Sequence, residues 1–180
     1  MTLASRCDGG LVQTKGPGAR SMRNLPVMNA RPGTTARLLV GALIATVTLL
    51  ASPAPAATPA TTYATQTFKA TNQERDERDL IVLRKNKCLQ RFANAQARKM
   101  AEEGQLSHQS LTRIQKRCGM GHVGENVAFG YPTGTATVAA WMKSPMHRAN
   151  ILFPKFRLMA ISARKAEGQW WVAQVFGRKG

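Results

Sequence analysis

Acidic residues are scarce in this sequence. Of its 180 residues only 9 are Asp or Glu, against 26 Lys or Arg, which gives a formal net charge of +17. Such a basic chain attracts polyanions: nucleic acid, an anionic membrane or an acidic cell-wall polymer. Aromatic residues make up only 6% of the chain and do not alternate with the basic ones as a base-stacking surface requires. This composition argues against nucleic acid as the partner.

The chain also lacks an apolar run that comfortably spans a bilayer, which takes about 20 residues. Residues 38–51 are uncharged and apolar but shorter than that, and Arg31 and Arg37 precede them. Ala54 and Ala56 follow in the small-x-small pattern of a cleavage site. These features predict a secretory signal peptide and no stable transmembrane span. The alternative is an uncleaved membrane anchor.

The signal peptide sets the expected domain boundaries. Residues 1–57 are interpreted as an N-terminal extension with the signal peptide. A start at Met28 would give a signal of ordinary length, so we hypothesise that translation begins there. Residues 58–69 are rich in Ala, Thr and Pro and predict a linker. Residues 70–180 are expected to form one domain.

Cysteine is rare, with three residues in the chain. Cys7 lies in the early segment, whereas Cys88 and Cys118 form an even pair in the domain. In an exported protein, a disulfide between these two is the natural expectation. It would close a loop of about 30 residues and contribute roughly 3–4 kcal/mol to stability. The alternative is two buried free thiols.

Histidine is equally rare, and its three copies surround one carboxylate. His108 and His122 precede Glu125, and His147 follows it. Glu125 belongs to residues 123–130, an apolar-leaning segment bracketed by glycines that predicts a strand. This carboxylate and the histidines around it are the one group of residues in the sequence that indicates a functional site. His122 is expected in a solvent-facing loop.

Hydrophobic periodicity predicts a mixture of helices and strands without a strict βαβ rhythm. The clearest helix covers residues 89–100 and ends at Gly104, which places His108 just beyond it. Ser144 and Pro145 predict the start of a short turn that carries His147. The remaining expected elements are a helical turn from Thr71–Asn72, a basic helix or turn at 111–118, a helix at 135–142, and strands at 156–163 and 169–176.

Several of these segments match one family in order. The chain resembles the CAP superfamily (cysteine-rich secretory, antigen 5 and pathogenesis-related 1 proteins) in its bacterial SCP-like extracellular branch, over residues 70–180. The matching segments are residues 72–75, 97–101 with Gly104, 107–108, Gly124-Glu125-Asn126-Val127-Ala128 with Gly130, Trp141-Met142-Lys143-Ser144-Pro145, His147-Arg148-Ala149-Asn150-Ile151-Leu152, and 170–176.

The resemblance implies an α+β fold: a three-layer α-β-α sandwich with a central, mostly antiparallel sheet and a cleft on one side. It also implies secretion. By motif match, His108 and Glu125 carry over as cleft residues, and His147 is the histidine of the bacterial branch. The chain departs from many eukaryotic members in one respect, because Trp171 stands where they have a further histidine. A second glutamate of those members has no evident counterpart.

The cleft residues allow two interpretations. His108, Glu125 and His147 could bind Zn²⁺ or another divalent metal and leave one coordination position open. Alternatively, the three residues hydrogen-bond to one another and shape the cleft. No nucleophile–base pair is identifiable, and Ser107 and Ser144 are expected to be turn or capping residues.

We therefore expect a secreted, extracellular, monomeric protein that binds without catalysis through a His/Glu cleft at the bacterial envelope. The expected partner is an anionic cell-wall polymer or lipid. One alternative is a metal-dependent hydrolase that uses the same cleft. The other is a lipid or sterol carrier. No catalytic residue is assigned.

Overall fold

The computed structural model describes residues 58–180. The expected signal peptide and the hypothetical start at Met28 lie outside these residues. Within the described range, no helix combines the length and the apolar character needed to cross a membrane.

Residues 58–180 form helices and strands in mixed order. Along the chain they are α1 (Pro59–Asp76), β1 (Arg84–Lys85), α2 (Lys87–Glu103), α3 (Leu111–Cys118), β2 (Met120–Phe129), α4 (Gly134–Lys143), α5 (Pro145–Ile151), β3 (Leu158–Ala166) and β4 (Gln169–Lys179).

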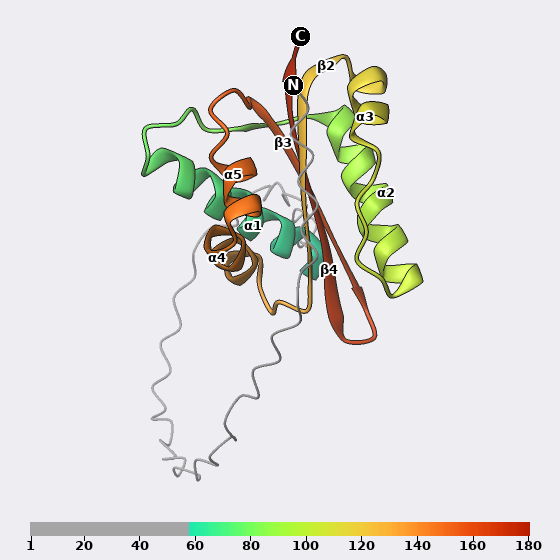
Figure 1. Ribbon diagram of the computed structural model, residues 1–180. Helices are drawn as coiled ribbons and strands as arrows, with labels where there is room; N and C mark the ends of the chain where they lie inside the picture. Colours follow the sequence, from blue (N-terminus) through green and yellow to red (C-terminus); the bar gives the residue numbers. More distant parts are fainter. Residues whose placement is uncertain (1–57) are drawn as a thin grey trace, which may run out of the picture. The chain divides into compact units, whose positions relative to one another are not determined.

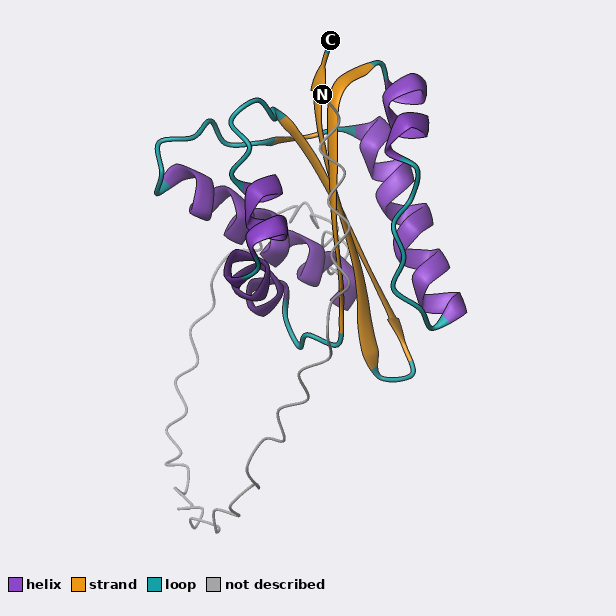
Figure 2. Ribbon diagram, viewed as in Figure 1, coloured by secondary structure: helices purple, strands orange, loops and turns teal. Residues whose placement is uncertain are grey.

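The strands form one sheet in the order β1-β3-β4-β2. β1 is parallel to β3, whereas β3–β4 and β4–β2 are antiparallel. Helices α2 and α3 cover one face of the sheet, and α1, α4 and α5 cover the other (Figures 1 and 2). The predicted α+β class, with a mostly antiparallel sheet between two helical layers, is confirmed. β2 lies at one edge of the sheet, which matters for the site it carries.

Helix α2 follows its sequence pattern closely. Asn86 caps it by accepting hydrogen bonds from the backbone N–H groups of Cys88 and Leu89, both at 3.0 Å. Its buried face repeats at three- and four-residue steps and packs on the sheet. Gly104 ends it at φ 61°, a left-handed conformation that glycine adopts without steric cost. His108 therefore lies four residues beyond a rigid helix end.

The prediction of a linker over 58–69, followed by a new helical turn at Thr71, is wrong. α1 begins at Pro59, after a cap in which Thr58 accepts from the N–H of Thr61. Tyr63 and Thr67 lie one helical turn apart and are buried, and the Tyr63 hydroxyl is 2.5 Å from Thr137 of α4. An Ala- and Thr-rich composition resembles a linker, but here the small residues let α1 approach α4 closely.

Asn72 has a different role from the cap that its position at the expected helix start indicated. It lies inside α1, and its side chain binds both backbone polar groups of Leu83. The amide nitrogen donates to the Leu83 carbonyl at 3.0 Å, and the amide oxygen accepts from the Leu83 N–H at 2.8 Å. Asn72 thus fixes the chain as it enters β1.

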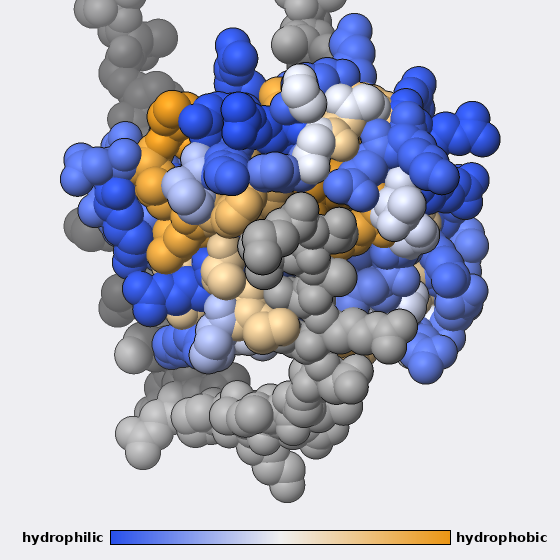
Figure 3. Space-filling model, turned by 45° about the horizontal axis from the view of Figure 1, so that its top comes forward, coloured by the Kyte–Doolittle hydropathy of each residue, from blue (hydrophilic) through white to orange (hydrophobic). Residues whose placement is uncertain are grey.

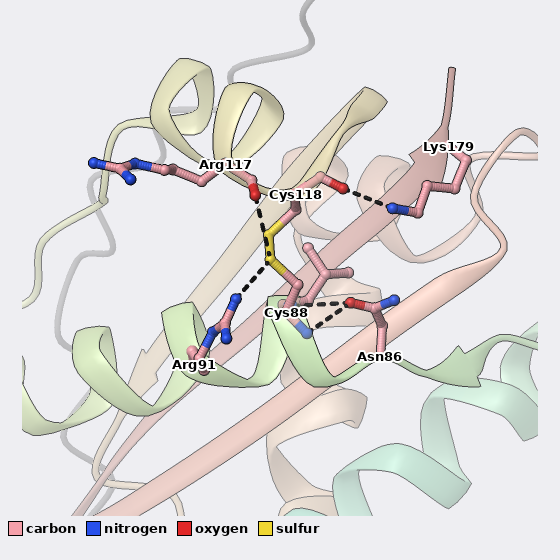
Figure 4. Close-up of a disulfide and its surroundings, with 7 residues drawn as sticks. Asn86, Cys88, Arg91, Arg117, Cys118 and Lys179 are labelled. Atoms are coloured by element: carbon pink, nitrogen blue, oxygen red, sulfur yellow. Dashed lines mark hydrogen bonds between the residues drawn. A yellow bond between two sulfur atoms is a disulfide. The ribbon is translucent and has the colours of Figure 1, made fainter.

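The predicted disulfide between Cys88 and Cys118 is confirmed. It joins the first turn of α2 to the last residue of α3, with Cα atoms 5.8 Å apart and a sequence separation of 30 residues. Figure 4 shows the guanidinium of Arg91 directed toward the Cys88 sulfur, 3.5 Å away. On the other side Lys179 donates to the Cys118 carbonyl at 2.8 Å. The two helices of this layer are therefore linked covalently.

We expect Cys88→Ser to lower the free energy of unfolding by roughly 3–4 kcal/mol, because the disulfide restricts a loop of about 30 residues in the unfolded chain. Urea denaturation of the oxidised wild type and the variant measures this difference. Reduced wild type serves as the control and should unfold with the variant. Equal midpoints for oxidised wild type and variant would contradict the prediction.

Candidate functional site

Glu125 is a buried carboxylate at the centre of the candidate site, with a side chain that is 1% exposed. Its Oε1 lies 2.8 Å from Nδ1 of His108 and accepts from the backbone N–H of Gln109 at 3.1 Å. Its Oε2 accepts a hydrogen bond from the side-chain amide of Gln109. Both oxygens are thus occupied by neighbours from the loop between α2 and α3.

The alternation of β2 explains why Glu125 faces this loop. Val123 and Val127, two positions away on either side, pack in the clusters that α2 and α3 form with the sheet. Asn126 points to the opposite face, where it donates to the backbone carbonyl of His147 at 3.2 Å and to Gln174 at 3.0 Å. Glu125 therefore belongs to the α2–α3 layer.

His147 lies in the opposite helical layer, on α5. Its Nδ1 is 2.9 Å from the hydroxyl of Ser144, at the residue before the helix. Ser144 occupies the predicted capping position, but this hydroxyl makes no capping bond to the helix backbone. Burial, and secondarily the charge of His108, lower the pKa of His147. A neutral His147 can accept the Ser144 proton.

These residues do not form the metal site that sequence reasoning allowed. The structure brings His108 and Glu125 into contact, but His147 bonds to Ser144 instead. Within residues 58–180, no three His, Cys, Asp or Glu side chains are placed to hold one ion. The arrangement as it stands does not fit a resident metal.

His122 takes no part in this group. It was expected in a loop, but it lies within β2, and its ring centroid is 5.7 Å from that of Phe153. The extended strand begins at Met120, earlier than the glycines of this region indicated.

A basic pocket of about 630 Å³ opens beside His108, between α2 and α3. The surface on the side of these helices is predominantly hydrophilic (Figure 3). None of the residues that line the pocket is acidic. The ten lining residues are Arg91, Phe92, Ala95, Gln96, Lys99, His108, Gln109, Ser110, Arg113 and Arg117. Four cationic side chains therefore line this cavity, and one of them, Lys99, lies 3.9 Å from the carboxylate of Glu103, which is outside the lining.

One atom at the pocket has no partner. Within the described part of the chain, Nε2 of His108 is the single buried side-chain nitrogen or oxygen without a hydrogen bond. Buried polar groups are normally satisfied, so an orphan of this kind calls for an explanation. His108 also lines the basic pocket, so this unpaired nitrogen belongs to a residue of the pocket wall.

Sequence reasoning missed Gln109 and the cationic rim. Gln109 neighbours His108 and makes two of the three hydrogen bonds to Glu125, but an isolated glutamine gives no sequence signal. Arg113 and Arg117 did give a sequence signal, because two residues four apart on a helix lie on the same face. Arg91, on α2, also lines the pocket.

Comparisons with known proteins agree on one family. The sequence profile of CAP, described as the cysteine-rich secretory protein family, matches residues 68–176. The protein YkwD of Bacillus subtilis (strain 168) is 32% identical over 123 residues, which is 64% of this chain and 48% of YkwD. The match thus spans about half the length of that relative.

Solved structures give the same result. An extracellular SCP-domain protein of Bacillus anthracis superposes with a TM-score of 0.60 at 25% identity, covering 70% of this chain and 45% of that one. An outer surface protein of Borrelia burgdorferi superposes with a TM-score of 0.58 at 20% identity, covering 63% and 90% respectively. The second likeness shows a shared fold alone.

Proposed function

Because the chain belongs to the CAP family of cysteine-rich secretory proteins, we propose that it is an exported binding protein. Its ligand is an anionic polymer of the bacterial envelope, held in the basic pocket without chemical conversion. Similarity to a Bacillus anthracis protein described as extracellular supports export, as does the signal-like segment at 38–51.

The observation that carries the proposal is the charge of the pocket lining. Arg91 and Lys99 come from α2, and Arg113 and Arg117 come from α3, so cations face the cavity from both walls. Guanidinium groups bind phosphate and carboxylate through paired hydrogen bonds. A repeated anionic polymer could contact several of them at once, while Phe92 and Ala95 offer apolar surface to its backbone.

The state of Glu125 supports binding rather than catalysis. A general base must lie within hydrogen-bond reach of the proton that it abstracts. Glu125 is buried, and both of its oxygens accept hydrogen bonds from His108 and Gln109. Its role in the proposal is to orient these two side chains at the pocket, where they meet the ligand.

We expect Arg113→Gln/Arg117→Gln to weaken binding of poly(glycerol phosphate) by about tenfold or more, because two charge-assisted contacts are lost. The protein recovered after export is titrated by calorimetry at low and moderate salt. Binding to the wild type should weaken as salt screens the charges. The matched control is Arg98→Gln/Lys116→Gln, which removes the same net charge from α2 and α3 at residues outside the pocket lining.

Three outcomes would contradict the proposal. Equal weakening by both double variants would show general charge attraction instead of a site. Conversion of the polymer to shorter products would show an enzyme. Binding only to vesicles of anionic phosphatidylglycerol, with no affinity for the polymer, would make a lipid the ligand.

A further inference from the structure

The two edges of the sheet differ in how far side chains cover their outward backbone groups. At the β2 edge, side chains cover the outward carbonyls: Trp141 donates to Val127 at 3.2 Å, and Asn150 donates to Glu125 at 3.0 Å. Such covering prevents another strand from adding to an edge. At the opposite edge, the two residues of β1 pair only with Leu158 and Met159, and beyond them Gln90 covers one outward carbonyl, that of Ile161.

Among the strands of the described part of the chain, none neighbours the outer side of β3 beyond Met159, over residues 160–166. Within residues 58–180, one side-chain bond reaches this stretch of backbone, from Gln90 to the carbonyl of Ile161 at 2.7 Å. That bond shows that the backbone polar groups of Ile161 point outward. In an antiparallel pair every second residue does the same, so those of Ala163 also point outward.

A groove of about 390 Å³ occupies this position. Ile161 and Ala163 pack into the cluster on the α1 side, and Ala160 packs into the cluster on the α2 side. The groove therefore lies between the two helical layers, where the next strand of the sheet would be. The small residues Ala60 and Ala64 of α1 line it, together with the larger side chains of Phe68, Gln90 and Asn94.

We propose that this groove binds a short extended peptide of small residues that adds as a strand to β3 and ends in a free carboxylate. Main-chain hydrogen bonds to an open edge are the basis of strand addition. The alanines of the lining leave space for side chains of about the size of alanine. At about 3.3 Å per residue, three or four peptide residues would cover the outer edge from Ala160 to Arg164.

The charged side chains at the groove indicate which terminal groups the bound peptide carries. Lys85 and Arg164 line it, and none of its lining residues is acidic. A peptide that runs parallel to β3, as β1 does, brings its C-terminus to Arg164 and its N-terminus to Lys85. A carboxylate is favourable beside Arg164, whereas a free amine is unfavourable beside Lys85. The bound peptide therefore has a blocked N-terminus.

The test is an NMR titration of the full protein with N-acetyl-trialanine, compared with the same peptide carrying a C-terminal amide. We expect backbone amide shifts at residues 160–164 and along α1 from Ala60 to Thr65. The amide should bind about fivefold more weakly or worse, because the contact with Arg164 is lost. Arg164→Gln should remove this difference, whereas Lys165→Gln, at a neighbouring residue outside the groove, should preserve it.

A second pair of variants tests the location. Thr61 lines the groove and is exposed, while Thr62 is exposed but lies outside its lining. Thr61→Tyr should abolish binding by filling the groove, and Thr62→Tyr should leave it intact, with both variants showing a folded spectrum. The proposal would be overturned if the wild type showed no shifts at the solubility limit of the peptide. It would also be overturned if Thr61→Tyr and Thr62→Tyr bound the peptide equally, or if the shifts were confined to other regions. It is independent of the ligand proposed for the basic pocket.

Discussion

Replacing Arg75 by Met is expected to lower the free energy of unfolding by at least about 4 kcal/mol. Arg75 is 0% exposed at the end of α1, and burial, followed by the charge of Arg157, lowers its pKa to about 10. Its guanidinium donates to four backbone carbonyls: Ile81 at 2.9 Å, Ile151 at 2.7 Å, Phe153 at 3.1 Å and Phe156 at 3.5 Å.

Methionine keeps an unbranched apolar side chain, although a shorter one, and donates no hydrogen bond, so these carbonyls would lose their donor. Each buried polar group left unsatisfied costs about 1–3 kcal/mol. Arg78→Met is the matched control, because Arg78 is exposed and pairs with Glu74 at 2.8 Å. The free energy of unfolding of that variant should fall by about 1 kcal/mol or less. If urea denaturation gave equal losses for both variants, Arg75 would not have the structural role assigned to it.

The second large effect is expected at Gly134, the first residue of α4. A Cβ atom there would lie closer than 3.0 Å to Thr67 and to the backbone carbonyl of Tyr63, both on α1. Backbone cannot yield as a flexible side chain can. Gly134→Ala should therefore force α1 and α4 apart and cost about 3 kcal/mol or more.

Gly104→Ala is the control for this substitution. Gly104 has φ 61°, but a Cβ added to it would have no neighbouring atom within 4 Å, so only backbone strain of about 1 kcal/mol is expected. Thermal unfolding of both variants compares the two costs. A loss at Gly134 no greater than that at Gly104 would show that α1 is not packed against α4 as described.

The sequence predicted the elements whose patterns are local. For helix α2 the periodic apolar face and the terminal glycine were both recognised along the chain, whereas its cap at Asn86 was not. The strands at 156–163 and 169–176 were likewise predicted, and the turn between β3 and β4 falls at Glu167–Gly168, where both residues have positive φ. Such features depend on neighbours a few residues away, so composition and spacing are sufficient to find them.

The sequence did not reveal features that depend on distant contacts. α1 was interpreted in part as a linker because Thr67 and Gly134 are ordinary residues until they meet across 67 positions. Arg75 belonged to a recognised motif, yet its four carbonyl partners come from other parts of the chain. The same limitation hid the basic pocket, whose walls belong to two helices joined by a disulfide.

The most direct test of the proposed binding site is to map where an anionic polymer binds. Short poly(glycerol phosphate) is titrated into isotopically labelled protein, and backbone amide shifts are followed. We expect saturable shifts along α2 from Arg91 to Lys99 and from His108 to Arg117, with a change in the ring signals of His108. Shifts spread evenly over all basic surfaces, or centred away from α2 and α3, would contradict the assignment of the basic pocket as the binding site.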